Sequence, residues 1–196
     1  VRYAVAKNPS TPQKLLEKIA RKQSEDIATR DVAIERIKDE KILLDMAKDS
    51  KVSIRMTVAS HPDTPREVLE MLAKDSSYFV RKEVATNQNT PESALEMLAN
   101  DEQIAVREVL AYCRYTPSKV LTILAEDSNY DVRTEVVLNC NTPPEVLEIL
   151  AKDYSLVIRK KVIQHPNVTK DILEEMLTRD SVAIIRRLAE GMLNKK

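Results

Sequence analysis

Apolar residues recur along most of the chain in short runs with helical spacing, and polar turns separate these runs. Val68, Leu69 and Leu72 share one face of an expected helix, and residues 146–150 repeat the same spacing. A shorter apolar run follows each of these, marked by the pattern Val-Arg-x-x-Val. The sequence lacks the alternation of apolar and polar residues that is typical of strands. The pattern therefore predicts an all-α chain made of pairs of short helices.

These pairs recur with a constant period. The dipeptide Thr-Pro stands at residues 64–65, 90–91, 116–117 and 142–143, so successive prolines are 26 residues apart. A pair at 11–12 opens an earlier unit, and one extra residue near 174–175 displaces the last unit. About seven two-helix repeats of 26 residues fit the chain, which we treat as a single repeat domain over 1–196. Since short helices cannot bury their apolar stripes alone, the period predicts an α-solenoid of stacked repeats.

The turns that bound each helix also follow the period. We expect the threonine of Thr-Pro to be the N-cap and the proline to take the first helical position, with Glu67 and Glu145 completing capping boxes. The second helix ends at a polar position, occupied by Asn8, His61, Asn87, Asn139 and His165. Because the chain has one glycine, we expect the asparagines to supply the left-handed conformation that terminates helices.

Two charged residues keep the same period. The acidic row is Asp49, Asp75, Asp101, Asp127, Asp153 and Asp180, and the basic row, six residues later in each unit, is Arg55, Arg81, Arg107, Arg133, Arg159 and Arg186. A basic stripe for binding phosphates or carboxylates would not need an acid at a fixed offset. We therefore interpret the rows as a structural ladder. Each arginine is expected to pair with the aspartate six residues earlier or with that of a neighbouring unit, and the aspartate can also cap the inner helix.

Residues 132–153, VRTEVVLNCNTPPEVLEILAKD, resemble the leucine-rich repeat variant family, whose units follow V-R-x-x-V-A-x-N-P-x-T-P-x-x-L-L-x-x-L-A-x-D. Residues 1–20 match the same pattern, and the turn from Asp75 to Arg81 is similar to that of HEAT repeats. The resemblance covers nearly the whole chain and implies a right-handed superhelix with longer helices outside and short helices inside. Units of that family are commonly about 24 residues long, so the longer units here favour inner helices that are α-helical. A relative carries a cysteine-rich iron–sulfur segment before its repeats; this chain has no such cluster, so we expect no cofactor.

Residues suited to catalysis or metal binding are few. His61 and His165 are four repeats apart and cannot form one site. Cys113 and Cys140 lack the spacing of a metal site or a disulfide framework, and they favour a reducing, cytoplasmic location. One glycine leaves no phosphate loop or nucleophile elbow, and no apolar run is long enough to span a membrane. We therefore expect no catalytic, cofactor-binding or metal-binding residue and no membrane partner.

Positions one and five residues after each ladder arginine are expected to be exposed if the short helices line the inner face. They are Met56, Ser60, Lys82, Thr86, Glu108, Tyr112, Thr134, Leu138, Lys160 and Gln164. These residues vary between units, as expected of specificity positions on a constant scaffold. Tyr112, Tyr115 and Leu138 are predicted to form an amphipathic patch of the kind enriched at protein interfaces. Tyr115 would equally fit packing in the loop before Pro117.

We therefore expect a non-enzymatic, monomeric scaffold that binds a protein or peptide on its concave face. The net charge of zero, with 31 basic and 31 acidic residues, disfavours nucleic acid as a partner. One alternative stays open despite the 4% of aromatic residues and the lack of Trp: a HEAT-like nucleic-acid-binding or DNA-repair protein. The other is a repeat fragment of a larger protein, since the chain starts at Val1 inside a repeat and upstream segments are expected to be missing.

Overall fold

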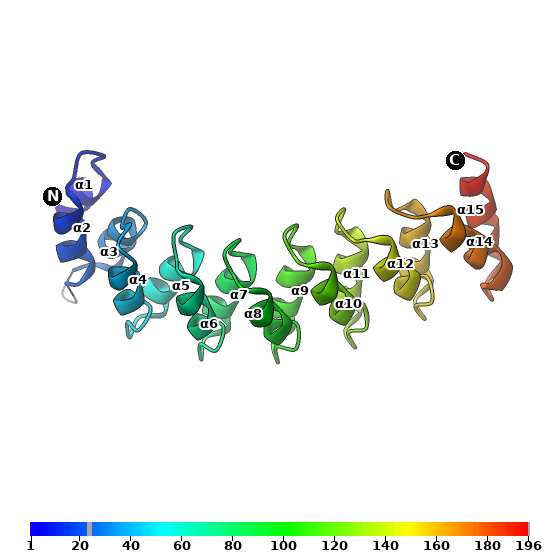
Figure 1. The fold of residues 1–196 in the computed structure, drawn as a ribbon, viewed down its shortest axis with the longest axis horizontal. Coiled ribbons are helices and arrows are strands. Elements are labelled where there is room, and N and C mark those ends of the chain that lie inside the picture. The colour runs from blue at the N-terminus through cyan, green and yellow to red at the C-terminus, as the bar shows by residue number, and fades with distance from the viewer. Residues whose placement is uncertain (23–24, 196) are drawn as a thin grey trace. The chain divides into compact units, whose positions relative to one another are not determined.

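The computed structural model describes residues 1–22 and 25–195, and over these residues it contains fifteen α-helices and no strand (Figure 1). In chain order they are α1 Arg2–Lys7, α2 Gln13–Ala20, α3 Ile27–Ile34, α4 Glu40–Met46, α5 Val52–Ser60, α6 Arg66–Leu72, α7 Tyr78–Thr86, α8 Glu92–Leu98, α9 Ile104–Tyr112, α10 Ser118–Ala125, α11 Tyr130–Leu138, α12 Pro144–Leu150, α13 Leu156–Gln164, α14 Lys170–Arg179 and α15 Ala183–Leu193. The chain forms two compact units, Val1–Leu98 and Ala99–Lys196. The single domain expected over 1–196 remains a prediction.

Each unit consists of two layers of helices. The even-numbered helices follow the Thr-Pro turns, and the odd-numbered helices carry the Val-Arg pattern. Among the described residues, successive odd-numbered helices pack on one another throughout each unit, whereas successive even-numbered helices are in substantial contact only at α10 and α12. The odd-numbered layer is therefore the more closely spaced, inner side of each unit. The inner helices are α-helical, as expected from the length of the repeat.

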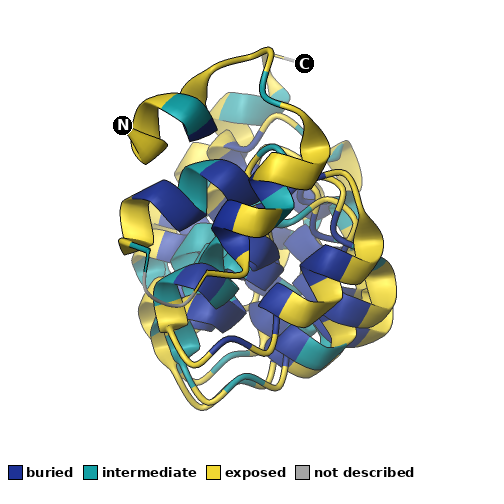
Figure 2. Cartoon of the chain, turned by 90° about the vertical axis from the view of Figure 1, so that its left-hand side faces the viewer, coloured by how far each residue is buried: buried dark blue, intermediate teal, exposed yellow. Residues whose placement is uncertain are grey.

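The core lies between the two layers and repeats with the sequence. Figure 2 shows buried residues on the sides of the helices that face the interior, with exposed residues on the outer sides and in the loops. On the odd-numbered helices, the residue three positions after a ladder arginine is fully buried. These residues include Val58, Val84, Leu110, Val136 and Val162. Complete burial of such a side chain contributes about 1.5–3 kcal/mol. Each repeat adds an equivalent set of buried side chains, so stability accumulates along the array.

The expected threonine N-caps are wrong. The N-cap residue is the proline, as at Pro65 and Pro117, and the helix begins one residue later. The threonine before it donates its hydroxyl to a carbonyl in the last turn of the preceding helix: Thr64 Oγ1 lies 2.6 Å from the Val58 oxygen. Since the threonine is not the cap, the expected capping boxes at Glu67 and Glu145 do not form. The acidic side chains still lie in the first turn, where they complement the helix dipole.

Units without this proline have a capping side chain in its place. Asp39 accepts hydrogen bonds from the first turn of α4, and Thr169 accepts one from Ile172 in α14. Proline offers no side-chain acceptor, but its fixed φ holds the chain in the extended conformation that precedes a helix. The same position therefore starts the helix by two different means.

The expected left-handed helix ends are also wrong. No non-glycine residue in the described part of the chain has a positive φ, and the five residues expected to end these helices are all extended, as at Asn139 (φ −69°, ψ 111°). Their side chains connect repeats instead. Asn139 Nδ2 donates to the carbonyl oxygens of Ala111 (2.8 Å) and Cys113 (3.0 Å), and its Oδ1 accepts from the Asn141 amide (3.1 Å). Asparagine suits this position because its side-chain amide supplies both a donor and an acceptor, and its tolerance of a left-handed backbone is not used.

Substitution Asn139→Ala is expected to lower the free energy of unfolding by about 1–3 kcal/mol, because it leaves buried backbone groups without partners. Asn139→His should cost less, because His165 occupies the equivalent position and keeps one of the two bonds to the preceding repeat and the bond from the amide two residues later. Urea unfolding followed by circular dichroism measures both. The exposed Asn141, which donates to the Arg114 carbonyl oxygen at 2.7 Å, provides the matched control. A loss for Asn141→Ala equal to that for Asn139→Ala would contradict the role assigned to the buried amide.

Candidate functional site

The ladder arginines lie at the turns between even- and odd-numbered helices. Arg133 Nε lies 2.6 Å from Asp153 Oδ2, and its Nη1 donates to the carbonyl oxygens of Asp127 (2.7 Å) and Ser128 (3.2 Å). The guanidinium also lies over the ring of Tyr154, 4.4 Å from its centre. Both charged side chains are 4% exposed. One guanidinium thus binds the turn of its own repeat and the carboxylate of the next repeat.

The same arrangement recurs with little variation. The carboxylate partners stand in the following repeat: Arg55 with Asp75, Arg107 with Asp127, Arg133 with Asp153 and Arg159 with Asp180. For Arg81 and Arg186 the structure gives the bonds to their own turns, from Nη1 to the carbonyl oxygens of Asp75 (2.8 Å) and Asp180 (2.7 Å). The aspartate six residues earlier therefore contributes its main-chain oxygen, and the carboxylate comes from the neighbouring unit.

The aspartates hold the turn before each odd-numbered helix. Asp75 Oδ1 accepts from the amide of Ser77 at 2.8 Å, and Ser77 is the N-cap residue of α7. The carboxylate therefore fixes the residue at the helix start, one step before the amides that a capping side chain would reach. Burial raises the pKa of Asp75, but hydrogen bonds from Arg55 and Ser77 outweigh it and hold the pKa below its ordinary value. Asp75 is thus ionised throughout the neutral range.

Two further arginines pair with an acid of the following repeat and were missed from the sequence. Arg30 is 1% exposed; its Nε donates to the Ala20 oxygen at 2.7 Å, and its Nη2 is bonded to Asp49. Arg2 forms an ion pair with Glu25. The interval from Arg30 to Arg55 is 25 residues rather than 26, so a fixed period overlooks it. The Val-Arg pair at the start of the chain was a usable signal for Arg2.

The two histidines occupy the helix-end position, one in each unit. His165 Nε2 lies 3.0 Å from the Asn139 carbonyl oxygen, and its Nδ1 accepts from the Asn167 amide at 3.1 Å. His61 Nδ1 likewise accepts from the Asp63 amide at 3.1 Å. In both rings Nδ1 thus accepts from a main-chain amide two residues later. The imidazoles replace asparagine side chains between repeats.

In each unit the expected specificity positions lie on the same stripe of the odd-numbered helices. Tyr112 is 72% exposed at the end of α9, and Leu138 is 53% exposed at the end of α11, the next helix of the same layer. Tyr115 is 55% exposed in the turn after α9, outside the helix. The half-buried members are Met56, Lys82, Glu108 and Lys160, and each lies one turn before the helix end.

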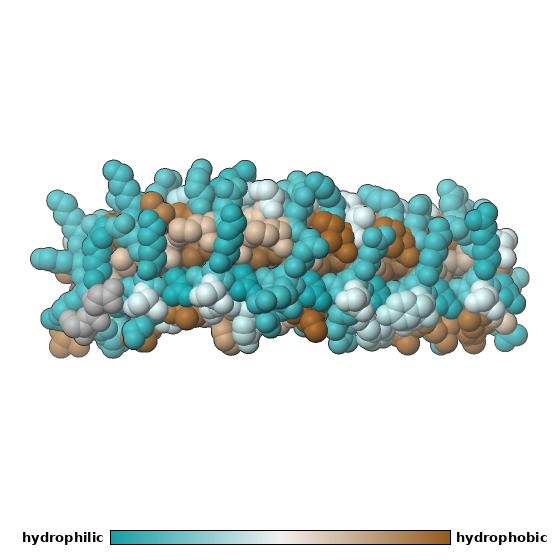
Figure 3. Space-filling view, turned by 90° about the horizontal axis from the view of Figure 1, so that it is seen from below, coloured by the Kyte–Doolittle hydropathy of each residue, from teal (hydrophilic) through white to brown (hydrophobic). Residues whose placement is uncertain are grey.

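A third row on this stripe was missed. Residues three before each ladder arginine lie one helical turn before the half-buried members, and in the second unit they include Ile104 (42% exposed), Tyr130 (40% exposed) and Leu156. Counting back four residues along the helix from Glu108 and Thr134 would have found them. The stripe is therefore more apolar than the sequence analysis expected. Figure 3 shows one face of the molecule, where apolar side chains are exposed between hydrophilic ones.

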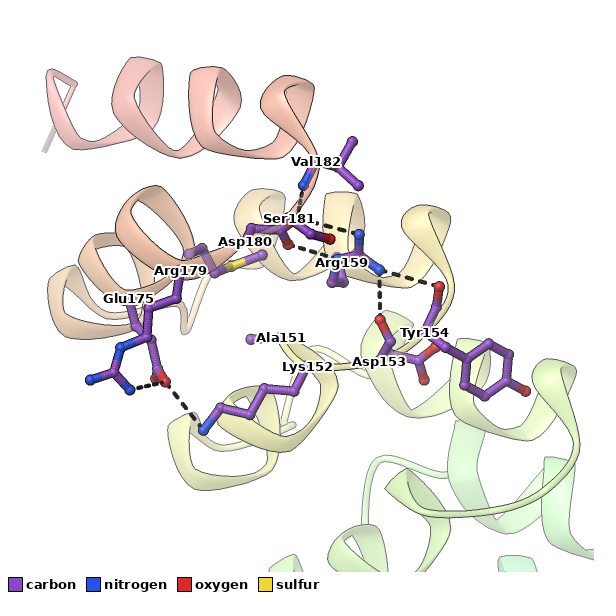
Figure 4. A pocket seen from close by; sticks show the side chains of 11 residues that line it. Ala151, Lys152, Asp153, Tyr154, Arg159, Glu175, Arg179, Asp180, Ser181 and Val182 are labelled. Atoms are coloured by element: carbon purple, nitrogen blue, oxygen red, sulfur yellow. Dashed lines mark hydrogen bonds and ion pairs between the residues drawn. The ribbon is translucent and has the colours of Figure 1, made fainter.

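A cavity of about 490 Å³ lies at the turns that join α12 to α13 and α14 to α15 (Figure 4). Its charged side chains are engaged with one another. Glu175 accepts from Lys152 (3.4 Å) and Arg179 (3.3 Å), while Arg159 binds Asp180 at 2.7 Å. The helix on one side, α14, has ten residues against seven in α12, which places the extra residue noted in the sequence beside this cavity. These internal pairs leave little charge for a ligand.

Two smaller hollows open on the odd-numbered layer itself. One, of about 260 Å³, is lined by residues of α3, α5 and α7, among them Met56 and Ser60. The other, of about 240 Å³, lies between α13 and α15 and includes Lys160 and Gln164. Expected specificity positions therefore line hollows in both units.

Other features of the described residues bear on chemistry. Within residues 1–22 and 25–195, no group of three or more His, Cys, Asp or Glu side chains could hold a metal ion. Cys113 and Cys140 are free thiols. Of the helices described, none is both long and apolar enough to cross a bilayer.

Residues 53–77 match the family model of the leucine rich repeat variant. A solved leucine-rich repeat variant, described as a novel repetitive structural motif, aligns with a TM-score of 0.66 and 25% identity over 93% of this chain and 72% of its own. The X-ray structure of YibA from E. coli aligns with a TM-score of 0.54 and 15% identity over 100% of this chain and 96% of its own, which supports the fold alone. None of the curated proteins matches the chain in sequence.

The stacked helix pairs and these similarities define an α-solenoid repeat protein. The repeats are similar to those of the leucine-rich repeat variant, as the resemblance in the sequence predicted.

Removing one side of a buried ladder pair should be costly. Arg133→Ala is expected to lower the free energy of unfolding by about 3–5 kcal/mol, because it leaves the buried Asp153 carboxylate without its counter-charge. Arg179→Ala, which removes an exposed pair with Glu175 (78% and 33% exposed side chains), should change it by less than about 0.5 kcal/mol. Chemical unfolding of both variants measures the difference. Equal losses would show that the ladder pair is no more than a surface ion pair.

The imidazole of His61 should make stability depend on pH. Burial lowers the pKa of His61. The charges of Asp63 and Glu35 and a hydrogen bond to the Glu35 main chain raise the pKa, but burial outweighs them. The unfolded state, with a pKa of about 6.5, therefore takes up a proton before the folded state does. Unfolding free energy is expected to fall as the pH drops from about 6.5 towards the lowered pKa, and to be constant above that window.

His61→Asn tests this, because asparagine fills the same position in neighbouring repeats without titrating. Its unfolding free energy should fall less than that of the wild type between neutral and mildly acidic pH, measured by urea unfolding. His165 is retained in both proteins, so its contribution cancels in the comparison. Parallel pH profiles of the two proteins would refute the assignment to His61.

Proposed function

We propose that the chain is a non-enzymatic scaffold that binds a protein or peptide along the odd-numbered, concave side of its repeats. The observation that carries this proposal is the contrast between constant and variable positions. The ladder and core positions keep the same residues and the same bonds from repeat to repeat. The exposed stripe of the same helices changes at nearly every repeat, from Thr86 to Tyr112 to Leu138 to Gln164. A constant frame with variable exposed side chains is how repeat proteins recognise extended partners.

The side chains of this stripe are suited to protein contacts. Tyr112 and Leu138 project from adjacent helices of one layer, and Ile104 and Tyr130 expose further apolar surface on the same two helices. Large, rigid aromatic side chains contribute strongly to binding because they bury much area at little entropic cost. The patch also carries Glu108 and Thr134, which offer polar groups for orientation. We expect these residues to contact an extended or helical peptide.

Two further properties support a binding role over catalysis. The buried titratable groups of the ladder are neutralised in pairs, and the histidines are held by main-chain groups between repeats. Groups engaged in this way are poorly placed for acid–base or nucleophilic chemistry. The free thiols of Cys113 and Cys140 agree with a cytoplasmic location, where thiols stay reduced.

The double substitution Tyr112→Ala and Leu138→Ala is expected to weaken binding of a selected peptide at least tenfold, about 1.4 kcal/mol. The probe is obtained by panning the wild-type chain against a displayed random-peptide library, and affinity is measured by fluorescence anisotropy. Because both residues are exposed, the unfolding free energy should change by less than about 0.5 kcal/mol.

Leu44→Ala with Met97→Ala is the matched control. These residues are 39% and 38% exposed on the even-numbered helices α4 and α8, so the control removes exposed apolar surface from the other layer. Its affinity for the peptide should equal that of the wild type. Equal loss in both variants would contradict binding on the odd-numbered side. A gel shift of single-stranded DNA at low salt, abolished by the inner-side substitution, would favour the nucleic-acid alternative instead.

A further inference from the structure

The hollow between α13 and α15 has an apolar floor. Ile163 is 2% exposed at its base, and Leu188 (38% exposed) and Met192 line its side. Its volume of about 240 Å³ is below the 300–1,000 Å³ of sites that enclose whole small molecules. It is open on the odd-numbered side of the second unit. The dimensions suit one apolar side chain of a larger partner.

The rim of this hollow is basic. Lys160 from α13 and Arg187 and Lys195 from α15 line it, and none of the described residues that line it is acidic. In the described part of the chain these three side chains have no ion pair or hydrogen bond, in contrast to the ladder arginines. Glu190 lies on α15 but is not part of the lining. Three cations that have no partner among the described residues surround an apolar base, and they complement a partner that carries carboxylates beside an apolar side chain.

Gly191 at the edge of the hollow has no role in the backbone or the core. It is the one glycine of the chain and lies inside α15, where glycine weakens a helix relative to alanine. Its φ is not positive, and a Cβ atom placed there would meet no atom within 4 Å. Tyr112 and Leu138 occupy the equivalent position on α9 and α11. The missing side chain therefore keeps the hollow open at a place where other repeats present a large residue.

We infer that the hollow between α13 and α15 binds an acidic segment of a partner protein, with one apolar side chain on the Ile163 floor and neighbouring carboxylates at Lys160, Arg187 and Lys195. The inference rests on the proposed scaffold function and names the chemistry of the partner at this end of the stripe. A nucleic acid fits less well, because Glu108, Asp131 and Glu135 lie on the odd-numbered helices that precede α13 and would repel a continuous polyanion.

The probe is a short labelled peptide of Glu and Gly residues around one central Leu, titrated by fluorescence anisotropy at low and at physiological salt. Matched peptides carry Gln in place of Glu, or Ser in place of Leu. Each matched peptide is expected to bind at least about tenfold more weakly, because it lacks one of the two features that the hollow recognises. Affinity for the acidic peptide should fall as salt increases.

Two protein variants test the site from opposite sides. Gly191→Leu fills the hollow and leaves every charge in place. It should raise the melting temperature of the protein and lower its affinity for the acidic peptide at least about tenfold. Lys160→Glu with Arg187→Glu keeps the hollow open and reverses the charge of its rim, and it should lower the affinity for the acidic peptide by a similar factor. The control, Lys170→Glu with Arg179→Glu on α14, makes the same change of net charge away from the hollow and should retain wild-type affinity.

The inference is overturned if the acidic peptide binds no better than its Gln counterpart, if Gly191→Leu retains affinity, or if an oligothymidylate displaces the peptide and depends on the same residues. The library peptides distinguish failure of the acidic-segment site from failure of the scaffold function. If they bind the wild type and depend on Tyr112 and Leu138 while the acidic peptide does not bind, only the present inference falls. If neither kind of peptide binds, both fall.

Discussion

The guanidinium–carboxylate pair at each turn is the interaction on which the rest of the structure depends. One planar group donates both to the main chain of its own repeat and to the aspartate of the next, so the distance and angle between successive repeats are set by the geometry of a single side chain. Lysine, a point charge without the planar fork, could not make both sets of bonds at once. Since the pair is buried, removing either partner is costly, although the intact pair contributes little net stability. Its main effect is to fix the register of the repeats.

A second set of bonds fixes the opposite end of the odd-numbered helices. Asn87, Asn139 and His165 each connect to carbonyl oxygens of the preceding repeat, and Arg36 makes similar bonds to the end of α1. The inner helices that end at these residues are thus held at both ends by polar groups and along their length by apolar packing. The exposed stripe takes no part in these bonds, so its residues can change without loss of the fold. This separation of scaffold from surface is what makes a binding function plausible in physical terms.

Much of the architecture could be predicted from the sequence, because a period of 26 residues repeats both the apolar spacing and the charged rows. The sequence could not predict details that depend on which of several possible hydrogen bonds a side chain makes. Thr64 is a good N-cap residue by type, yet its hydroxyl bonds the preceding helix because Pro65 already starts the next one. Asn139 tolerates a left-handed backbone, yet it is extended because its amide is used between repeats. Arg30 was missed because the spacing in its repeat is one residue short. The site was predicted only as a list of exposed positions, and the hollow at Gly191 required coordinates, since its depth depends on side chains from two helices.

The hydrogen bonds between repeats also govern how the chain can acquire its structure. Those that the structure describes between repeats reach from 16 residues, as from Arg30 to Met46, to 30 residues, as from Arg36 to Ala6. A chain whose partners are all this near in sequence has little loop entropy to overcome and needs no distant segment before it can pack. Each repeat can therefore dock on the preceding one as soon as it leaves the ribosome. At the growing end, the last ladder arginine lacks its carboxylate partner only until the next aspartate is synthesised.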